Sequence, residues 1–120
     1  MSLMTWLFAR KRKRNQSFIA DRAAEVIDHV IYDVGIDTLV NGTLLLDKRY
    51  RLRFIGGKPR TRKGILAAVT VSDLAESDIF RKLGHSVALD ASTLNVHTGC
   101  LVYAVMREFK AQSQAFRSLP

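Results

Sequence analysis

The clearest hydrophobic pattern in this chain runs from residue 17 to residue 35. Apolar side chains recur there at spacings close to 3.6 residues, the repeat of an α-helix with one buried face. Ser17 precedes the run as a predicted N-cap, and Gly35 follows it as a predicted stop. The apolar stripe comprises Ile19, Ala23, Val26, Ile27, Val30, Ile31 and Val34. We therefore expect an amphipathic helix near the N-terminus.

Patterns typical of β-strands follow this helix. Asn41 and Gly42 lie between two apolar runs in DTLVNGTLLLD, which predicts a tight hairpin with a strand on either side. In KRYRLRFIGG, Tyr50, Leu52 and Phe54 alternate with three arginines, as in a half-buried strand with a basic outer face. GGKPRTRKG, residues 56–64, predicts a mobile loop, and ILAAVTV, residues 65–71, predicts a buried strand.

The last third of the chain is harder to assign. SDLAESDIFRKLGH predicts a short helix, because Asp73 and Glu76 have the spacing of a capping box. SVALD and LNVH predict short strands. GCLVYAVMREF is apolar from Cys100 to Met106, so periodicity does not separate a final strand from a helix that reaches Phe116. We expect a strand through about Phe109 and a frayed tail after it.

The length and composition indicate a single domain. The chain has 120 residues, of which 48% are hydrophobic, enough for one core. We expect a basic N-terminal arm over residues 1–16, one domain over residues 17–110 and a tail over residues 111–120. The predicted class is α+β, with the N-terminal helix followed by a small, mainly antiparallel β-barrel or sandwich that carries one short helix.

Charge is arranged in blocks along the chain, which has a net charge of +8. Residues 1–20 hold five basic residues and no acid, residues 21–47 hold six acids and one arginine, and residues 48–63 hold eight basic residues and no acid. Two basic blocks favour a polyanion or an acidic protein as partner. The candidate contacts are Arg10, Lys11, Arg12, Lys13, Arg14, Arg49, Arg51, Arg53, Lys58, Arg60, Arg62 and Lys63.

The stretch WLFARKRKR, residues 6–14, is the most unusual segment. Its apolar part is too short to span a bilayer. We interpret it as an arm in which Trp6, Leu7 and Phe8 dock into a groove on a neighbouring subunit. The basic residues that follow them would then lie against DNA or an acidic protein surface. Deleting residues 1–14 should leave the fold intact and impair assembly.

The sequence offers no recognisable catalytic or metal-binding motif. His29, His85 and His97 are scattered without the spacing of a zinc site, and Cys100 lies in an apolar run with no adjacent base. A single cysteine cannot form an internal disulfide, which fits a reducing cytosolic setting. We expect a protein that is not an enzyme and holds no cofactor or metal.

The order of predicted elements resembles that of the head-tail joining, or head-completion, proteins of tailed bacteriophages. The corresponding stretches are FIADRAAEVIDHVIYDVGIDTLV, YRLRFIGG, AAVTVSDLAESDIFRKLGHSVALD and GCLVYAVMRE, which together cover most of residues 18–108. The helix-forming LAESDIFRKL and the basic N-terminal extension depart from the family pattern. The resemblance implies a structural protein of the virion, assembled in the host cytoplasm. It would form a homo-oligomeric ring between portal or adaptor and tail proteins, near the DNA channel.

Two alternatives stay open. In one, the protein is a peripheral membrane or matrix-type protein on the cytoplasmic face of a membrane, with Trp6, Leu7 and Phe8 inserted at the interface and Arg10–Arg14 on anionic headgroups. The second basic block has no part in that arrangement. In the other, the chain is a nucleic-acid-binding module whose Arg49–Lys63 strip contacts the phosphate backbone without reading sequence.

Overall fold

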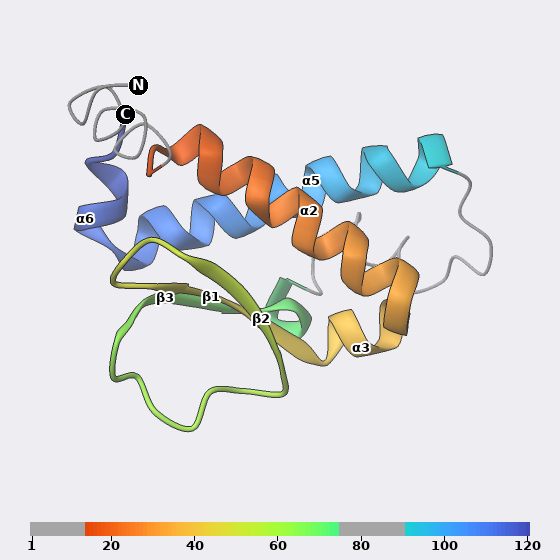
Figure 1. Cartoon of the computed structure of the whole chain (residues 1–120), viewed down its shortest axis with the longest axis horizontal. Helices are drawn as coiled ribbons and strands as arrows, with labels where there is room; N and C mark the ends of the chain where they lie inside the picture. The colour runs from red at the N-terminus through yellow and green to blue at the C-terminus, as the bar shows by residue number, and fades with distance from the viewer. Residues whose placement is uncertain (1–13, 75–90) are drawn as a thin grey trace, which may run out of the picture.

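The computed structural model describes residues 14–74 and 91–120, with the side chains of 91–97 outside the description. It contains helix α2 (Gln16–Val34), helix α3 (Ile36–Val40), strands β1 (Gly42–Asp47), β2 (Leu52–Gly56) and β3 (Ile65–Thr70), the 3-10 turn η1 (Val71–Leu74), helix α5 (Ala91–Gln112) and helix α6 (Gln114–Arg117). Figure 1 shows α2 and α5 side by side on one face of the sheet. The described chain is therefore α+β, as predicted, with a helix near its N-terminus.

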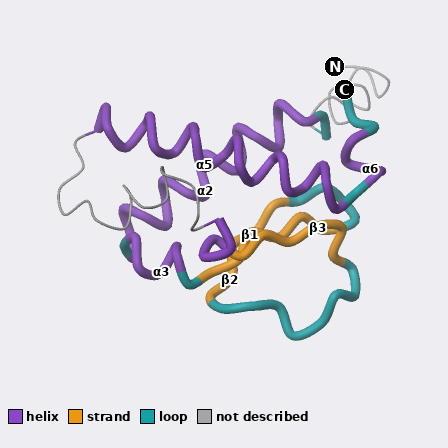
Figure 2. Tube along the Cα trace, turned by 180° about the vertical axis from the view of Figure 1, so that it is seen from behind, coloured by secondary structure: helices purple, strands orange, loops and turns teal. Residues whose placement is uncertain are grey.

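The three strands form one open antiparallel sheet in the order β2-β1-β3. The expected barrel or sandwich is wrong, because the described strands make a single layer that is covered by helices on one face. Since β2 and β3 both run antiparallel to β1, they are parallel to each other. The loop between them, residues 57–64, must therefore return past β1, and Figures 1 and 2 show it arching on the side away from the helices.

The prediction of α2 is confirmed, with one change at its start. Ile19, Ala23, Ile27 and Val30 are buried on its inner face. The N-cap is Asn15, not Ser17, because the Asn15 side chain accepts a hydrogen bond from the backbone N–H of Phe18 at 2.8 Å.

Gly35 ends α2 as predicted. Its φ of 96° lies in the left-handed region that glycine adopts without strain. Val34, the last residue of the predicted stripe, lies outside the core and is 59% exposed.

The hairpin predicted at Asn41 and Gly42 is wrong. Residues 36–40 form α3, and Asn41 caps that helix by donating its side-chain amide to the carbonyl of Asp37 at 2.9 Å. Gly42 then begins β1, where a Cβ would overlap the ring of Phe54 and lie 2.7 Å from the carbonyl oxygen of Ile55. Gly42 is therefore needed because β1 and the Phe54 ring approach closely. The Asn-Gly dipeptide is also typical of hairpin turns, which is why the sequence predicted one here.

The actual β1–β2 turn lies between Asp47 and Arg51. Tyr50 closes it by donating its N–H to the carbonyl of Asp47 at 2.9 Å, with a φ of 61° that is unusual for a residue with a side chain. The predicted β2 alternation is confirmed, since Leu52 is buried and Arg51 and Arg53 are exposed. The predicted loop at 57–64 and strand β3 are also confirmed as a loop and a strand.

The prediction for the C-terminal third is wrong where the structure describes it. The stretches LNVH and GCLVYAVMREF were expected as strands, but both belong to helix α5. Leu101, Val105 and Phe109 are buried at intervals of four residues, which is a helical stripe inside a continuous apolar run. The predicted helix at SDLAESDIFRKLGH begins with η1 and otherwise, like the strand SVALD, lies outside the described residues.

Residues 111–120 are part of the core domain and do not form the expected frayed tail. Phe116 on α6 is fully buried and packs edge-on against Phe109, with 5.7 Å between the ring centroids. Gln16 at the start of α2 donates its backbone N–H to the carbonyl of Pro120 at 3.1 Å and its side-chain amide to the carbonyl of Leu119 at 3.0 Å. These contacts join the first described helix to the last residues.

Candidate polyanion-binding surface

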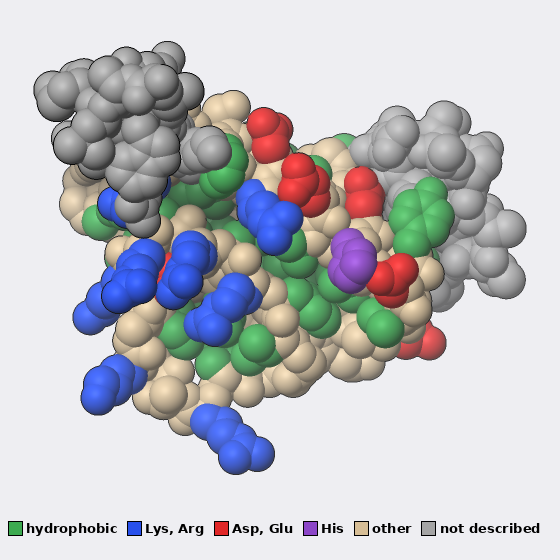
Figure 3. Space-filling view, viewed as in Figure 1, with side chains coloured by type: hydrophobic (Ala, Val, Ile, Leu, Met, Phe, Trp, Pro, Cys, Tyr) green, Lys and Arg blue, Asp and Glu red, His purple; other side chains and the backbone are tan. Residues whose placement is uncertain are grey.

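Eight basic side chains from one stretch of sequence are exposed together, and we call them the basic surface. They come from the β1–β2 turn, from the outer face of β2 and from the 57–64 loop. Figure 3 shows blue side chains gathered over the hairpin and the loop. The members are Lys48, Arg49, Arg51, Arg53, Lys58, Arg60, Arg62 and Lys63.

The sheet register explains why Arg53 points away from the core. Leu44 and Leu46 of β1 face the helices and belong to the main hydrophobic cluster. Leu45 faces the opposite way, and its cross-strand partners are Arg53 on β2 and Ala68 on β3. Alternation along β2 then places Arg51 on the same outer face as Arg53.

The 57–64 loop lies on this outer face as well. Thr43, which shares the orientation of Leu45, donates its hydroxyl to the carbonyl of Gly57 at 2.7 Å. At the far end of the loop, Lys48 donates its backbone N–H to the carbonyl of Gly64 at 3.1 Å. The loop is thus tied at both ends to β1 and to the residue that follows it, on the side of the sheet away from the helices.

Asp47 is the acid that holds the basic hairpin in shape. Its carboxylate accepts hydrogen bonds from the backbone N–H of Arg49 at 2.8 Å and of Arg51 at 3.0 Å, and from the Arg51 guanidinium at 3.1 Å. Burial alone would raise the pKa of Asp47. The hydrogen bonds from Arg51 and Arg49 and the positive charge of Arg51 outweigh it and hold the pKa below its ordinary value.

Positive charge on the basic surface is largely unneutralised. Among residues 14–74 and 98–120, Arg51 is the only member with an ion-pair partner, which is Asp47. The other seven side chains project from a turn, a strand face and a loop, with no ion-pair partner among the carboxylates that the structure describes. This arrangement can neutralise several phosphates and offers no fixed geometry for reading bases.

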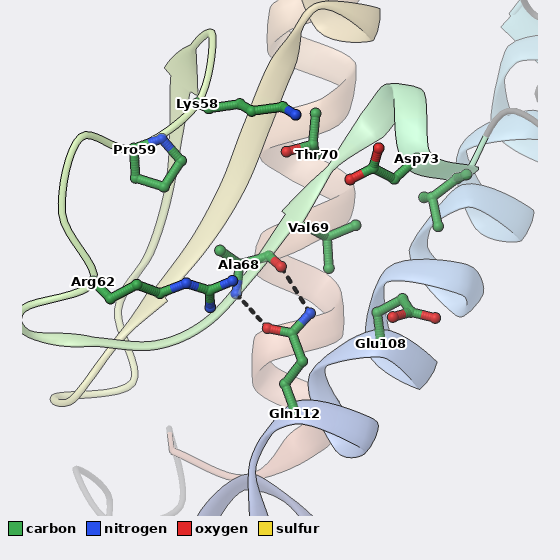
Figure 4. Close-up of a pocket in the computed structure, with 10 residues that line it drawn as sticks. Lys58, Pro59, Arg62, Ala68, Val69, Thr70, Asp73, Glu108 and Gln112 are labelled. Carbon is green, nitrogen blue, oxygen red and sulfur yellow. Dashed lines mark hydrogen bonds between the residues drawn. The ribbon is translucent and has the colours of Figure 1, made fainter.

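A cavity of about 410 Å³ lies between the loop, β3 and α5. Lys58 and Arg62 line it on the loop side, and Asp73 and Glu108 line it from η1 and α5 (Figure 4). Gln112 of α5 closes its floor by exchanging two hydrogen bonds with the backbone of Ala68, at 2.9 and 2.8 Å. Because two carboxylates oppose the two cations, the cavity itself is not an anion site, and the outer side of the loop carries the positive field.

The remaining predicted site residues are only partly placed. Arg14 is described and exposed, whereas the docking residues Trp6, Leu7 and Phe8 and the basic residues Arg10, Lys11, Arg12 and Lys13 lie outside the described residues. The structure therefore brings together the second basic block and leaves its relation to the first as a prediction. Sequence reasoning missed Lys48 as a named contact and Asp47 as the organiser, although the Asp47-to-Arg51 spacing is typical of a short turn.

Residues with metal-binding or nucleophilic potential do not converge in the described part of the chain. His29 Nε2 lies 3.0 Å from the carboxylate of Asp33 on the surface of α2, so a neighbouring side chain is the partner of its ring. The side chain of Cys100 is half-buried. No group of three potential metal ligands occurs among the residues that the structure describes, and none of the helices described is long and apolar enough to cross a membrane.

Comparison with known proteins adds no relative: no protein-family model, curated protein or solved structure matches this chain.

Proposed function

We propose that this protein is a non-enzymatic binding and assembly module that contacts the phosphate backbone of a nucleic acid. The observation that carries this proposal is the basic surface, with seven exposed cations that lack an ion-pair partner among the described residues. Such an array releases bound counterions from a nucleic acid, which makes binding favourable at low salt and weak at high salt.

The layout of aromatic side chains supports contact with the backbone in preference to the bases. Tyr50 and Phe54 alternate with the arginines in sequence, and both side chains are partly buried and pack against the hydrophobic core. Single-stranded binding proteins usually place aromatic rings on the binding face, where bases stack on them. A duplex, which presents mainly phosphates, fits this surface better.

The narrower proposal is a ring at the neck of a tailed bacteriophage, bound to portal or adaptor and tail proteins, with its basic surface toward the DNA channel. It comes from the sequence resemblance. Of the stretches on which it rests, the first forms helices α2 and α3, YRLRFIGG contains β2, and GCLVYAVMRE, matched to a final strand, forms helix α5. The narrower proposal therefore rests on the order of elements in the sequence.

The decisive experiment measures duplex binding as a function of salt. We expect wild-type protein to bind a short DNA duplex at low salt, with an affinity that falls steeply as salt rises. A variant in which Lys58, Arg60, Arg62 and Lys63 are all changed to Gln should bind about a hundredfold more weakly at low salt. The slope of log affinity against log salt concentration should also be shallower, by the equivalent of up to about four phosphate contacts.

The matched control removes charge from α2 instead. A variant with Asp21→Asn, Glu25→Gln and Asp33→Asn should bind the duplex at least as tightly as wild type, because it raises the net charge without touching the basic surface. Absence of duplex binding at low salt refutes the proposal. Binding to anionic vesicles that exceeds binding to DNA and needs Trp6 and Phe8 would favour the membrane alternative instead.

A mass measurement tests the ring. Native mass spectrometry of the full chain should show a closed oligomer, alone or with portal protein, and deletion of residues 1–13 should abolish it while leaving the circular-dichroism spectrum unchanged. A strictly monomeric full-length chain that also fails to join portal protein contradicts the ring and leaves the DNA-binding proposal standing.

A further inference from the structure

A groove between α2 and β2 lies apart from the cavity beside the loop. Two adjoining cavities, of about 410 and 530 Å³, share Arg22 as a lining residue. Together they follow α2 from Phe18 to Val30, a distance of about 18 Å at the rise of an α-helix. The apolar lining residues are Phe18, Ile19, Val26, Val30, Tyr50, Leu52 and Phe54.

One wall of this groove is an edge strand. β2 has a single neighbour, β1, in the described sheet. Asp47 donates its N–H to the carbonyl of Arg51 at 3.0 Å, so this is a hydrogen-bonded pair of the ladder. Antiparallel pairs alternate, and therefore Arg53 and Ile55 bond to β1 while Leu52 and Phe54 direct their N–H and C=O groups outward. These outward groups have no hydrogen-bond partner among the described residues.

The groove also carries uncompensated positive charge. Arg22, Arg51 and Arg53 line it. Arg22 pairs with Glu25 at 2.9 Å and Arg51 pairs with Asp47, but Arg53 has no ion-pair partner in the part of the chain that the structure describes. An occupant that adds acidic side chains beside Arg53 and Arg51 would be attracted to this edge.

We propose that the groove binds an extended acidic peptide, which adds to the sheet as a further strand along β2. Its backbone would pair with the free N–H and C=O groups of Leu52 and Phe54. Side chains directed toward α2 would meet Val26 and Phe18 and should be apolar, whereas those directed to the outer face would meet Arg51 and Arg53 and should be acidic. The partner is thus a segment in which apolar and acidic residues alternate over about five residues.

This chain itself offers two possible occupants of the groove, a second copy and its own basic N-terminal segment, and charge repulsion disfavours both. Two copies joined edge to edge through β2 would place the Arg51 and Arg53 side chains of one copy against those of the other, and like charges opposed in this way are destabilising. The segment Arg10–Arg14 is wholly basic and would meet the same arginines. An acidic segment of another protein is complementary on both counts.

The test uses a synthetic probe, the capped peptide Val-Asp-Val-Asp-Val-Asp, and the full-length protein. Amide hydrogen exchange is followed by NMR with and without saturating peptide. In the free protein the amides of Leu52 and Phe54 should exchange faster than those of Arg53 and Ile55, which bond to β1. Peptide binding should slow exchange at Leu52 and Phe54 by at least about tenfold, with little change at Arg53.

Matched charge reversals then separate this groove from the loop. Arg53→Glu should weaken peptide binding by roughly fivefold or more, because an attraction becomes a repulsion, and Arg60→Glu on the loop should change it by less than about twofold. The loop variant with four glutamines, which tests DNA binding, should keep full affinity for the peptide. Failure of one proposal is thereby distinguishable from failure of the other.

Several results would overturn the inference. They include unchanged exchange at Leu52 and Phe54 under saturating peptide, equal affinity for a peptide with Lys in place of Asp, and equal affinity for a peptide that is N-methylated along one edge. Free protein whose Leu52 and Phe54 amides are already protected in a dimer would also exclude it, since a second copy would then fill the edge.

Discussion

Helix α2 carries four acids and one arginine, whereas the basic surface carries eight cations and no acid, and the two regions also differ in how the fold pairs their charges. On α2, Glu25 pairs with Arg22, Asp33 with His29, and Asp28 accepts a hydrogen bond from the Thr98 hydroxyl at 2.8 Å. Three of the four acids that α2 carries therefore have a partner within the subunit. On the basic surface, Arg51 is the only member with an ion-pair partner among the residues that the structure describes.

This difference in local charge pairing favours the basic surface, and not α2, as the place where an external partner binds. Charges that are paired locally contribute little to a long-range field, whereas seven cations without an ion-pair partner among the described residues would attract a polyanion over a Debye length, about 10 Å at moderate salt. A ring contact in which the acidic helix faces the basic block of the next subunit would use Asp21 more than its paired neighbours. The basic surface is consequently better suited to phosphates than to α2 of another copy.

The largest expected effect comes from removing Asp47, the acid that is hydrogen-bonded within the basic hairpin. Asp47→Ala should lower the free energy of unfolding by about 2 to 3 kcal/mol, because it leaves the N–H groups of Arg49 and Arg51 without their acceptor at a site that is 11% exposed. Asp33→Ala, on α2 and 56% exposed, should cost less than about 0.5 kcal/mol. Urea denaturation measures both, and equal losses would show that the two acids are held alike.

A smaller effect should appear as pH falls. The pKa of Asp47 is lower in the folded protein than its ordinary value, so ionised Asp47 stabilises the fold above that ordinary value, near pH 4. This contribution is lost as pH falls through the lowered folded pKa. The stability difference between wild type and Asp47→Asn, measured as urea midpoints converted to free energy, should therefore shrink below about pH 4. A difference that stays constant down to pH 2 would contradict the assignment.

The fold was predictable where local pattern and tertiary packing agree. The stripe from Ile19 to Val30 repeats at a helical spacing and is buried as expected, and the alternation from Arg51 to Phe54 matches a strand with one wet face. In both cases apolar and polar residues repeat with the period of the element, so the pattern indicates which side faces water. The glycine- and proline-containing stretch between Gly56 and Gly64 likewise contains the residues that loops need.

Prediction failed where a residue serves two kinds of structure. Asn41 and Gly42 fit a hairpin, but Asn41 ends a helix and Gly42 makes room for Phe54. The run from Leu101 to Met106 is rich in β-branched and aromatic residues, yet packing against α2 and β3 favours a helix there. The candidate site was found from charge alone, whereas the role of Asp47 and the groove beside β2 depend on strand register, which the sequence does not specify.

The smallest expected effect concerns the ion pairs themselves. A double-mutant cycle on Arg22 and Glu25, each changed to Ala, should give a coupling energy of about 0.3 to 0.5 kcal/mol, since both side chains are more than half exposed and lie one helical turn apart. The same cycle on Arg51 and Asp47 should give a larger value, because the Asp47 carboxylate is mostly buried and hydrogen-bonded to the turn. Molar salt should remove most of the first coupling and less of the second. Couplings of equal size and equal salt sensitivity would mean that Asp47 acts through its backbone contacts alone, so that Arg51 would join the other members of the basic surface as a cation free to bind phosphate.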